Sequence, residues 1–198
     1  IGFINAQGDN IRFSQEDLDQ RVSADIAVTL RDQGRTLMLE LREQSTSLTL
    51  GGLQSKPVVS FLREFSAPVR VKYVRPDTEL AFLVKNDTDG FVAWDSQQSL
   101  WSRYFSADAE PLSANPVQTL GEIARQALTV ESADKLMLAA TMLTVPTENY
   151  LFEELASFNL DHLLDQRDAV LTEAAQTHRD IWAELVDRHI NGQPYTAD

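Results

Sequence analysis

Hydrophobic and polar residues alternate along much of the first 74 positions of the chain. The alternation is clearest at 26–30, 36–41, 48–50 and 69–73. Polar stretches that contain glycine separate these runs, at 7–10, 32–34 and 51–52. A period of two places the apolar side chains on one face of an antiparallel sheet, and the polar stretches are typical of turns. This spacing of short strands predicts an antiparallel β-sandwich of the Ig-like type.

The predicted sandwich has about five or six strands, fewer than the roughly seven of a closed Ig-like sandwich. The chain also opens on the apolar run Ile1–Ile4, without an initiator Met. We therefore expect an incomplete sandwich whose first strands lie upstream in a longer protein. Within it we expect Phe65 and Val69 to lie on the buried face.

After Pro76 the hydrophobic period changes to 3.6 residues, which predicts helices. Five are expected, over 77–84, 90–105, 116–127, 132–143 and 148–155. Residues that favour helix starts precede or open them: Asp77, Asp89, Asn115, Ser132 and Thr147.

The longest predicted element is a single helix that begins after Asn159 and meets no Gly or Pro until Gly192. One apolar stripe runs along it: Leu160, Leu163, Leu164, Leu171, Ala174, His178, Ile181, Leu185 and Val186. At 1.5 Å per residue it would be about 45 Å long, and it would need neighbours throughout. We therefore expect a superhelix-like α-helical domain over 75–198, truncated at its C-terminal side, after a partial sandwich domain over 1–74.

Composition and charge narrow the class of protein. With 43% hydrophobic residues and only 8 Gly and 7 Pro in 198 residues, the chain is typical of a globular protein. No window approaches 18 consecutive apolar residues, so we expect no membrane partner. A formal charge of −13 without a basic stripe argues against a nucleic-acid partner. The absence of Cys excludes disulfides and thiolate chemistry, and it is compatible with the cytoplasmic localisation that we expect.

The three histidines, His162, His178 and His189, are the first candidates for metal ligands. Zinc needs at least three protein ligands, and a helical pair of His is usually four residues apart. Separations of sixteen and eleven residues give no such pair. We interpret His178 and His189 as packed or interfacial histidines and predict no metal site.

The sequence Asn-Asp-Thr-Asp-Gly at 86–90 is similar to the start of an EF-hand calcium loop. In that pattern the first ligand would fall on Lys85 and the closing Glu on Ser96, so both ends fail. A turn between two helices, with Asp89 as the cap, accounts for the same residues.

Other reactive side chains lack the neighbours that catalysis requires. Ser66 and Ser132 have no Gly-x-Ser-x-Gly elbow and no His partner. Glu153 and Glu154 are adjacent on a helix and therefore point in different directions. We predict that the chain contains no catalytic and no cofactor-binding residues.

Trp94, Trp101, Tyr104 and Phe105 could form an aromatic recognition surface or a buried stripe of a helix. Their helical spacing favours core packing. Gln98 falls within the stripe, and a buried amide needs hydrogen-bond partners.

Three blocks carry a resemblance to a known family. Pro57–Val69 is similar to the pattern Pro-x-Pro-Ser-Leu-Leu-Arg-x-Phe-Ser-Ala-Pro-Val. The second block is Phe91, Trp94, Asp95 and Gln98, and the third is Leu143, Pro146, Glu148, Tyr150 and Leu151. In this order they resemble the aminopeptidase N branch of the M1 zinc metallopeptidases. Residues 12–35 resemble nothing in that family and are interpreted as an insertion.

The resemblance implies an enzyme that removes N-terminal residues from peptides by attack of a zinc-activated water. The family's His-Glu-x-x-His zinc motif, its Gly-Ala-Met-Glu-Asn segment and its stabilising Tyr have no counterpart in this chain. The resemblance therefore places the zinc in the catalytic domain of a parent protein. It implies that this chain is a non-catalytic structural fragment, with a sandwich spacer and a helical cap that shapes access to the active-site chamber.

The partner implied in this way is the catalytic domain of the same polypeptide. Peptide substrates would bind only in the context of the parent protein. The truncated surfaces of an isolated chain could also self-associate. The alternative is a free-standing protein-binding module built on the same two folds. A His-Glu-x-x-His motif upstream in the open reading frame would separate the two hypotheses.

Overall fold

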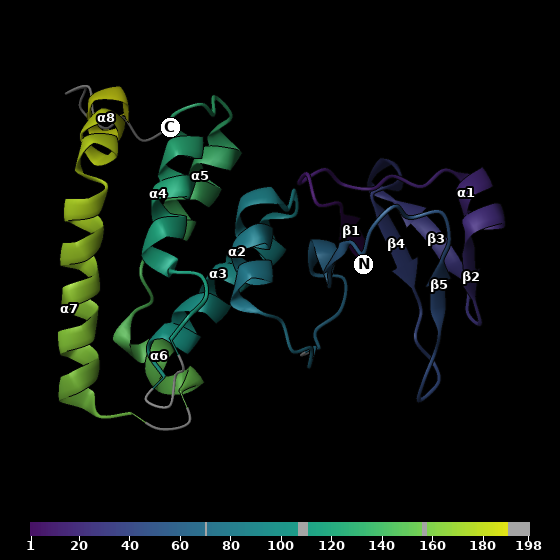
Figure 1. Ribbon diagram of the computed structural model, residues 1–198, viewed down its shortest axis with the longest axis horizontal. Helices are drawn as coiled ribbons and strands as arrows, with labels where there is room; N and C mark the ends of the chain where they lie inside the picture. Colours follow the sequence, from purple (N-terminus) through teal and green to yellow (C-terminus); the bar gives the residue numbers. More distant parts are fainter. Residues whose placement is uncertain (70, 107–110, 156–157, 190–198) are drawn as a thin grey trace, which may run out of the picture. The chain divides into compact units, whose positions relative to one another are not determined.

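The computed structural model describes residues 1–69, 71–106, 111–155 and 158–189, and these belong to two compact units (Figure 1). The first unit comprises Ile1–Arg75 and Phe82–Ala93, and the second comprises Pro76–Ala81 and Trp94–Asp198. The expected order of a β region followed by helices is confirmed. The domain boundary that we place after residue 74 stays a prediction.

The first unit contains two antiparallel sheets. Its strands are β1 (Gly2–Ile4), β2 (Val22–Ala24), β3 (Val28–Arg31), β4 (Thr36–Leu39), β5 (Leu48–Leu50) and β6 (Val58–Ser60). A four-stranded sheet has the order β3-β4-β1-β6, and β2 pairs with β5 in a second sheet. The central strand β1 is buried along its whole length.

Residues 12–35, interpreted as an insertion, are part of the β core. They form the short helix α1 (Gln15–Arg21) and the strands β2 and β3. Ser14 caps α1, because its hydroxyl accepts the Asp17 N–H while Asp17 Oδ2 accepts the Ser14 N–H. Buried Phe13 packs edge-to-face on Phe3 with ring centroids 6.0 Å apart. The segment therefore helps to build the core of this unit.

The turn between β3 and β4 lies at the predicted polar stretch and requires glycine at its last position. Gly34 has φ +82°, and a Cβ there would lie 2.2 Å from the Phe13 carbonyl oxygen. The Gly34 backbone therefore packs against the Phe13 backbone just before β4 begins. Leu41, predicted as the end of the strand, lies past β4 and is 67% exposed.

The predicted strand at 69–73 and the predicted burial of Phe65 and Val69 are wrong. In the described part of this segment no residue is in a strand, and Phe65 and Val69 are 59% and 57% exposed. The physical cause is a tight turn directly after β6, the 3₁₀ helix η2 (Arg63–Phe65). Leu62, Glu64 and Phe65 adopt positive φ values of 56°, 57° and 49°, which lie outside the region that a continuing strand uses.

The helices follow the predicted pattern closely up to Leu155. They are α2 (Asp77–Asn86), α3 (Gly90–Tyr104), α4 (Pro116–Ala127), α5 (Ala133–Met142), α6 (Glu148–Glu154), α7 (Leu160–Thr177) and α8 (Arg179–His189). Asn115 caps α4 through the Val117 N–H at 2.8 Å, and Thr147 caps α6. Ser132 precedes α5, but its side chain forms no capping hydrogen bond.

The prediction of one uninterrupted helix after Asn159 is wrong, because the chain breaks between α7 and α8 (Figure 1). His178 has φ −115° and ψ 25° at the break, and it is only 4% exposed. Its Nε2 donates to the Val117 carbonyl oxygen of α4 at 2.9 Å. Its ring covers Gly121, where a Cβ would lie 2.3 Å from the ring Cε1. The break seats the imidazole against α4.

The predicted stripe is therefore only partly buried. Leu163, Ala174 and His178 are buried, together with Val170, which the prediction omitted. Leu160, Leu164, Leu171 and Val186 are exposed large hydrophobic residues in this structure.

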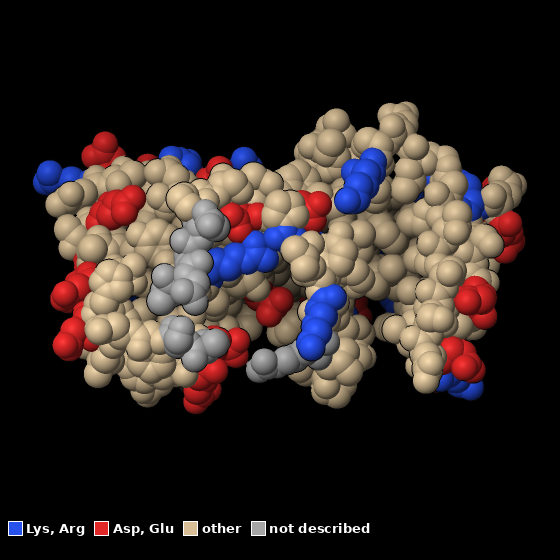
Figure 2. All heavy atoms as spheres, turned by 60° about the horizontal axis from the view of Figure 1, so that its bottom comes forward, with Lys and Arg blue, Asp and Glu red and all other residues tan. Residues whose placement is uncertain are grey.

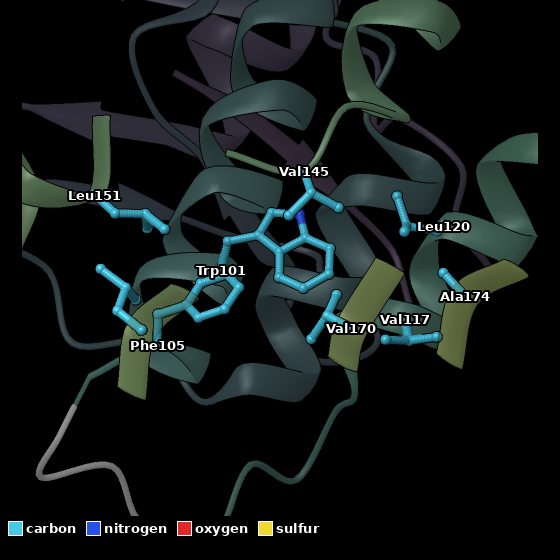
Figure 3. Packing of buried hydrophobic residues seen from close by; sticks show 9 residues of the cluster. Trp101, Phe105, Val117, Leu120, Val145, Leu151, Val170 and Ala174 are labelled. Atoms are coloured by element: carbon cyan, nitrogen blue, oxygen red, sulfur yellow. The ribbon is translucent and has the colours of Figure 1, made fainter. Parts of the chain in front are cut away.

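The core of the second unit is built around Trp101 (Figure 3). Its indole is fully buried and stacks with Phe105 at a centroid distance of 5.8 Å. Side chains of α4, α6 and α7, with Val145 between α5 and α6, complete the cluster: Val117, Leu120, Val145, Leu151, Leu163, Val170 and Ala174. The interpretation of Trp101 and Phe105 as core residues is confirmed.

Candidate functional site

The most elaborate polar arrangement in the first unit surrounds Arg63, which is 2% exposed. Its guanidinium donates to Ser60 Oγ at 2.8 Å, the Arg35 carbonyl oxygen at 3.2 Å, Asn10 Oδ1 at 2.6 Å and Asp87 Oδ1 at 3.0 Å. These partners come from β6, the β3–β4 turn, the segment after β1 and the α2–α3 connection. One side chain thereby joins four separate parts of the unit.

Glycine at position 2 makes room for this guanidinium. A Cβ on Gly2 would lie 2.2 Å from Arg63 Cζ. The guanidinium therefore lies against the backbone of the central strand β1, where any larger residue would displace it.

Arg63 and Asp87 form a buried ion pair whose side chains are 1% and 0% exposed. Burial raises the pKa of the Asp87 carboxyl above its usual value, although the charge of Arg63 and nearby hydrogen bonds act against this rise. The Asp89 N–H also donates to Asp87 Oδ1, at 2.9 Å. The pair fixes the connection between α2 and α3 to the β region of the same unit.

Asp89 binds the backbone of the turn at 62–65, where three residues have positive φ values. Its Oδ2 accepts the N–H of Glu64, a residue with φ +57°, at 2.7 Å. Its Oδ1 accepts the Val92 N–H at 3.0 Å and so caps α3. The interpretation of 86–90 as a helix–helix turn with Asp89 as cap is confirmed, and both carboxylates of the calcium-like sequence bind donors of the chain itself.

A second, smaller polar cluster lies in the second unit. Asp77 was expected to cap α2, but it is the first residue of that helix, and its carboxylate binds elsewhere. Asp77 Oδ1 accepts from Arg103 Nη1 at 2.5 Å, and Oδ2 accepts the Ser113 N–H at 3.0 Å. Partial burial acts to raise the pKa of the Asp77 carboxyl. The hydrogen bonds from Arg103 and Ser113, together with the charge of Arg103, outweigh the effect of burial, so the pKa is lowered from its usual value.

The candidate reactive residues differ in burial. His162 and His189 are exposed, whereas His178 is buried against α4. Ser66, Ser132, Glu153 and Glu154 are exposed, and Gln98 is 6% exposed. Among the residues that the structure describes, no three His, Cys, Asp or Glu side chains gather as metal ligands. That the chain has no catalytic, cofactor-binding or metal-binding residue stays a prediction.

Two surface properties bear on partners. On the face that Figure 2 shows, Lys and Arg lie in separate small groups among acidic and uncharged residues. Across the described ranges, no helix combines the length and the apolar character needed to cross a membrane.

Sequence reasoning found Ser60 and Arg63 only as part of a motif and missed their role. A signal was present, because Arg63 directly follows the apolar residues Phe61 and Leu62 and is the only cation between Pro57 and Val69. Its partners Asn10 and Asp87 lie 53 and 24 positions away, so the pattern along the chain could not identify them.

Two family profiles match the chain. Residues 1–74 match "Domain of unknown function (DUF3458) Ig-like fold", and residues 77–198 match "Domain of unknown function (DUF3458_C) ARM repeats". The predicted fold class, an Ig-like β region followed by a superhelix-like helical region, is confirmed.

Among curated proteins, aminopeptidase N of Escherichia coli K12 is 32% identical over 122 residues, which cover 59% of this chain and 14% of the relative. Aminopeptidase N of Haemophilus influenzae is 24% identical over 149 residues, covering 72% of this chain and 17% of the relative. The predicted resemblance to aminopeptidase N is confirmed.

Among solved structures, Legionella pneumophila aminopeptidase A in complex with aspartic acid matches with a TM-score of 0.70 and 20% identity. The match covers 100% of this chain and 20% of that chain, and it shows a shared fold. The chain thus spans no more than a fifth of the length of any of these three proteins.

Proposed function

Because this chain belongs to the family of DUF3458_C ARM-repeat domains, we propose that it is a non-catalytic structural part of an M1-family zinc aminopeptidase. The observation that carries the proposal is the 32% identity to aminopeptidase N over 122 residues. The parent enzyme would remove N-terminal residues from peptides with a zinc ion held outside residues 1–198.

Within such an enzyme the Ig-like region would act as a spacer and the helices as a cap that shapes access to the active-site chamber. Stacked helical repeats form extended surfaces suited to this role. The Arg63–Asp87 pair supports the spacer role, because this buried ion pair fixes the α2–α3 connection to the β region within the first unit. The partner of the chain would be the catalytic domain of the same polypeptide, and peptides would be met only in that context.

The open reading frame gives the first test. It should encode His-Glu-x-x-His upstream of Ile1. A complete reading frame without this motif would overturn the proposal and favour the alternative, a free-standing protein-binding module.

The capping role needs a functional test in the longer polypeptide. We would compare kcat/KM for a short aminoacyl amide with that for a peptide of many residues. His178→Ala, which loosens the packing of α7 and α8 on α4, should change the ratio between the two substrates. The exposed Thr172→Ala on α7 is the matched control and should leave the ratio unchanged. An unchanged ratio in His178→Ala, with hydrogen exchange showing that the helices have loosened, would contradict the capping role.

A further inference from the structure

We propose that the exposed side of α7 docks a basic amphipathic helix, that is, a protein segment with Lys and Arg beside its apolar residues. The docking side, called the α7 face below, consists of Leu160, Leu164, Leu171, Asp161, Asp165 and Asp168. All of it lies in the second unit, and its proposed role is independent of the function proposed above.

Apolar residues occupy two sides of α7, and only one of these sides is in the core. The helix packs against α4, and its buried residues belong to the cluster around Trp101 (Figure 1). In contrast, Leu160, Leu164 and Leu171 are 49%, 38% and 42% exposed. At 3.6 residues per turn these leucines fall within an arc of about 40° and form a row about 16 Å long.

A row of carboxylates runs beside the leucines. Asp161, Asp165 and Asp168 are exposed, and the helical repeat places them in the neighbouring arc of about 60°. Leu164 is three residues from Asp161 and four from Asp168, so these side chains are neighbours on the helix surface. Among the described residues, no cation pairs with any of the three carboxylates.

The one Lys or Arg of α7 does not balance this charge, because it is already bound. Arg167 Nη1 lies 3.0 Å from Glu148 Oε1, and Arg167 Nε donates to the Pro146 carbonyl oxygen at 3.0 Å. An acid of α6 therefore matches the charge of Arg167. The three aspartates of the α7 face are left without a counter-charge from their own helix.

The second unit as a whole is acidic as well. The sequence of the first unit has 11 Lys or Arg and 11 Asp or Glu, whereas that of the second has 6 and 19. The formal charge of −13 therefore belongs entirely to the second unit. A field of this sign attracts cationic partners and repels anionic ones before any contact is made.

Charge complementarity selects the occupant of the leucine row. A second copy would bring the same aspartates and the same net charge, and anionic lipids or nucleic acids would also be repelled. A basic amphipathic helix supplies apolar residues three and four positions apart for the leucines, and Lys and Arg for the aspartates. The length of the row is suited to about three turns of such a helix.

Binding of a model peptide to the 198-residue chain tests the proposal. The probe is a fluorescent peptide of about 18 Leu and Lys residues, with Leu on one helical face, and the reference peptide has Glu in place of every Lys. Fluorescence anisotropy is measured below the protein concentration at which light scattering detects self-association. The Leu–Lys peptide should bind at least about tenfold more tightly than the Leu–Glu peptide. Equal affinities, or no binding of either peptide, would overturn the proposal.

Matched variants locate the binding on α7. Asp165→Asn with Asp168→Asn should weaken binding of the Leu–Lys peptide about three- to tenfold. Glu131→Gln with Asp134→Asn removes two charges from exposed positions near the start of α5 and should change the Kd less than about twofold. Thermal melts check that both variants remain folded. Equal losses in the two variants would show that only the net charge matters and would overturn the site.

Salt dependence and crosslinking need no variant. Added salt should weaken peptide binding because it screens attraction, whereas it should strengthen the association of two acidic chains. A photo-crosslinker on the apolar side of the Leu–Lys peptide should attach to residues 160–171 of the unmodified chain. Attachment elsewhere, or peptide binding that strengthens with salt, would contradict the proposed docking of a basic helix on the α7 face.

Discussion

Arg63 and Asp87 show how single side chains stabilise the first unit. Both are charged, both are almost fully buried, and each supplies the other's counter-charge. A buried charge that loses its partner is strongly unfavourable, whereas apolar replacement of both partners can be tolerated. We therefore expect loss of one partner to destabilise the fold more than apolar replacement of both.

Asp87→Ala should lower the free energy of unfolding by about 3–5 kcal/mol, because it leaves the Arg63 guanidinium buried without a counter-ion. Urea denaturation monitored by circular dichroism measures the change. Asp19→Ala, an exposed acid on α1, is the control and should change stability by no more than about 0.5 kcal/mol. The double variant Arg63→Met with Asp87→Leu should lose less than the sum of the two single losses. Simple additivity would show that the two charges are not coupled.

Asp17 gives a pH-dependent prediction. Hydrogen bonds from the backbone and side chain of Ser14, and from Arg21, lower the pKa of Asp17 from 3.8 to about 2. A lowered pKa in the folded state contributes stability above the unfolded value, and this contribution is lost as the pH falls through the folded value. Asp17→Ala should therefore be less stable than the parent at pH 6, and the gap should close between about pH 4 and pH 2. A gap that is constant down to pH 2 would contradict the assignment.

At the scale of elements, the break between α7 and α8 shows how a distant contact ends a helix. Nothing in the sequence between Asn159 and Gly192 disfavours a helix, so periodicity predicts a continuous one. The cause lies on α4, where Gly121 leaves room for the His178 ring and the Val117 carbonyl oxygen accepts a hydrogen bond from His178 Nε2–H. Local patterns contain no information on this contact.

Gly121→Ala tests that contact, because the contact should reverse the sign of its effect on stability. In an exposed helix interior, Gly to Ala is stabilising by about 1 kcal/mol. Here the new Cβ would lie 2.3 Å from His178 Cε1, so we expect the substitution to destabilise the chain. In a His178→Ala background the same substitution should become stabilising. Thermal melts of the four proteins test this, and a stabilising effect in both backgrounds would show that the ring does not rest on Gly121.

The wrong strand prediction at 69–73 has a related cause. Alternation predicts which face of a segment suits a sheet, but a strand also requires a partner within reach. The positive φ values at Leu62 and Glu64 interrupt extended backbone after β6, and no apolar periodicity signals such a turn. In contrast, the predicted strands at 36–41 and 48–50 do contain β4 and β5, because their partners lie within the chain.

For the whole molecule, the change of period after Pro76 was enough to predict a β region followed by helices, and the family profiles match the same order. Burial was predicted less well on α7 and α8. Leu160, Leu164, Leu171 and Val186 have the spacing of core residues but are exposed. Such residues become buried only if something outside the described chain covers them.

The isolated chain should therefore self-associate through these exposed apolar residues. A net charge of −13 opposes close approach of two copies, and added salt screens this repulsion. Light scattering should show association that increases with protein concentration and with salt. Leu164→Glu with Leu171→Glu should reduce it, whereas Asp165→Ser on the same helix should not. A strictly monomeric chain at high concentration and high salt, without dye binding to apolar surface, would contradict this expectation.

The central claim is that this chain is a non-catalytic part of a zinc aminopeptidase. It is tested most directly by measuring zinc content and aminoacyl-amide hydrolysis side by side for the 198-residue chain and the longer polypeptide from the open reading frame. We predict about one zinc per chain and chelator-sensitive turnover for the longer polypeptide, and neither for the 198-residue chain. Stoichiometric zinc with turnover in the 198-residue chain, or their absence from the longer polypeptide, would contradict the claim.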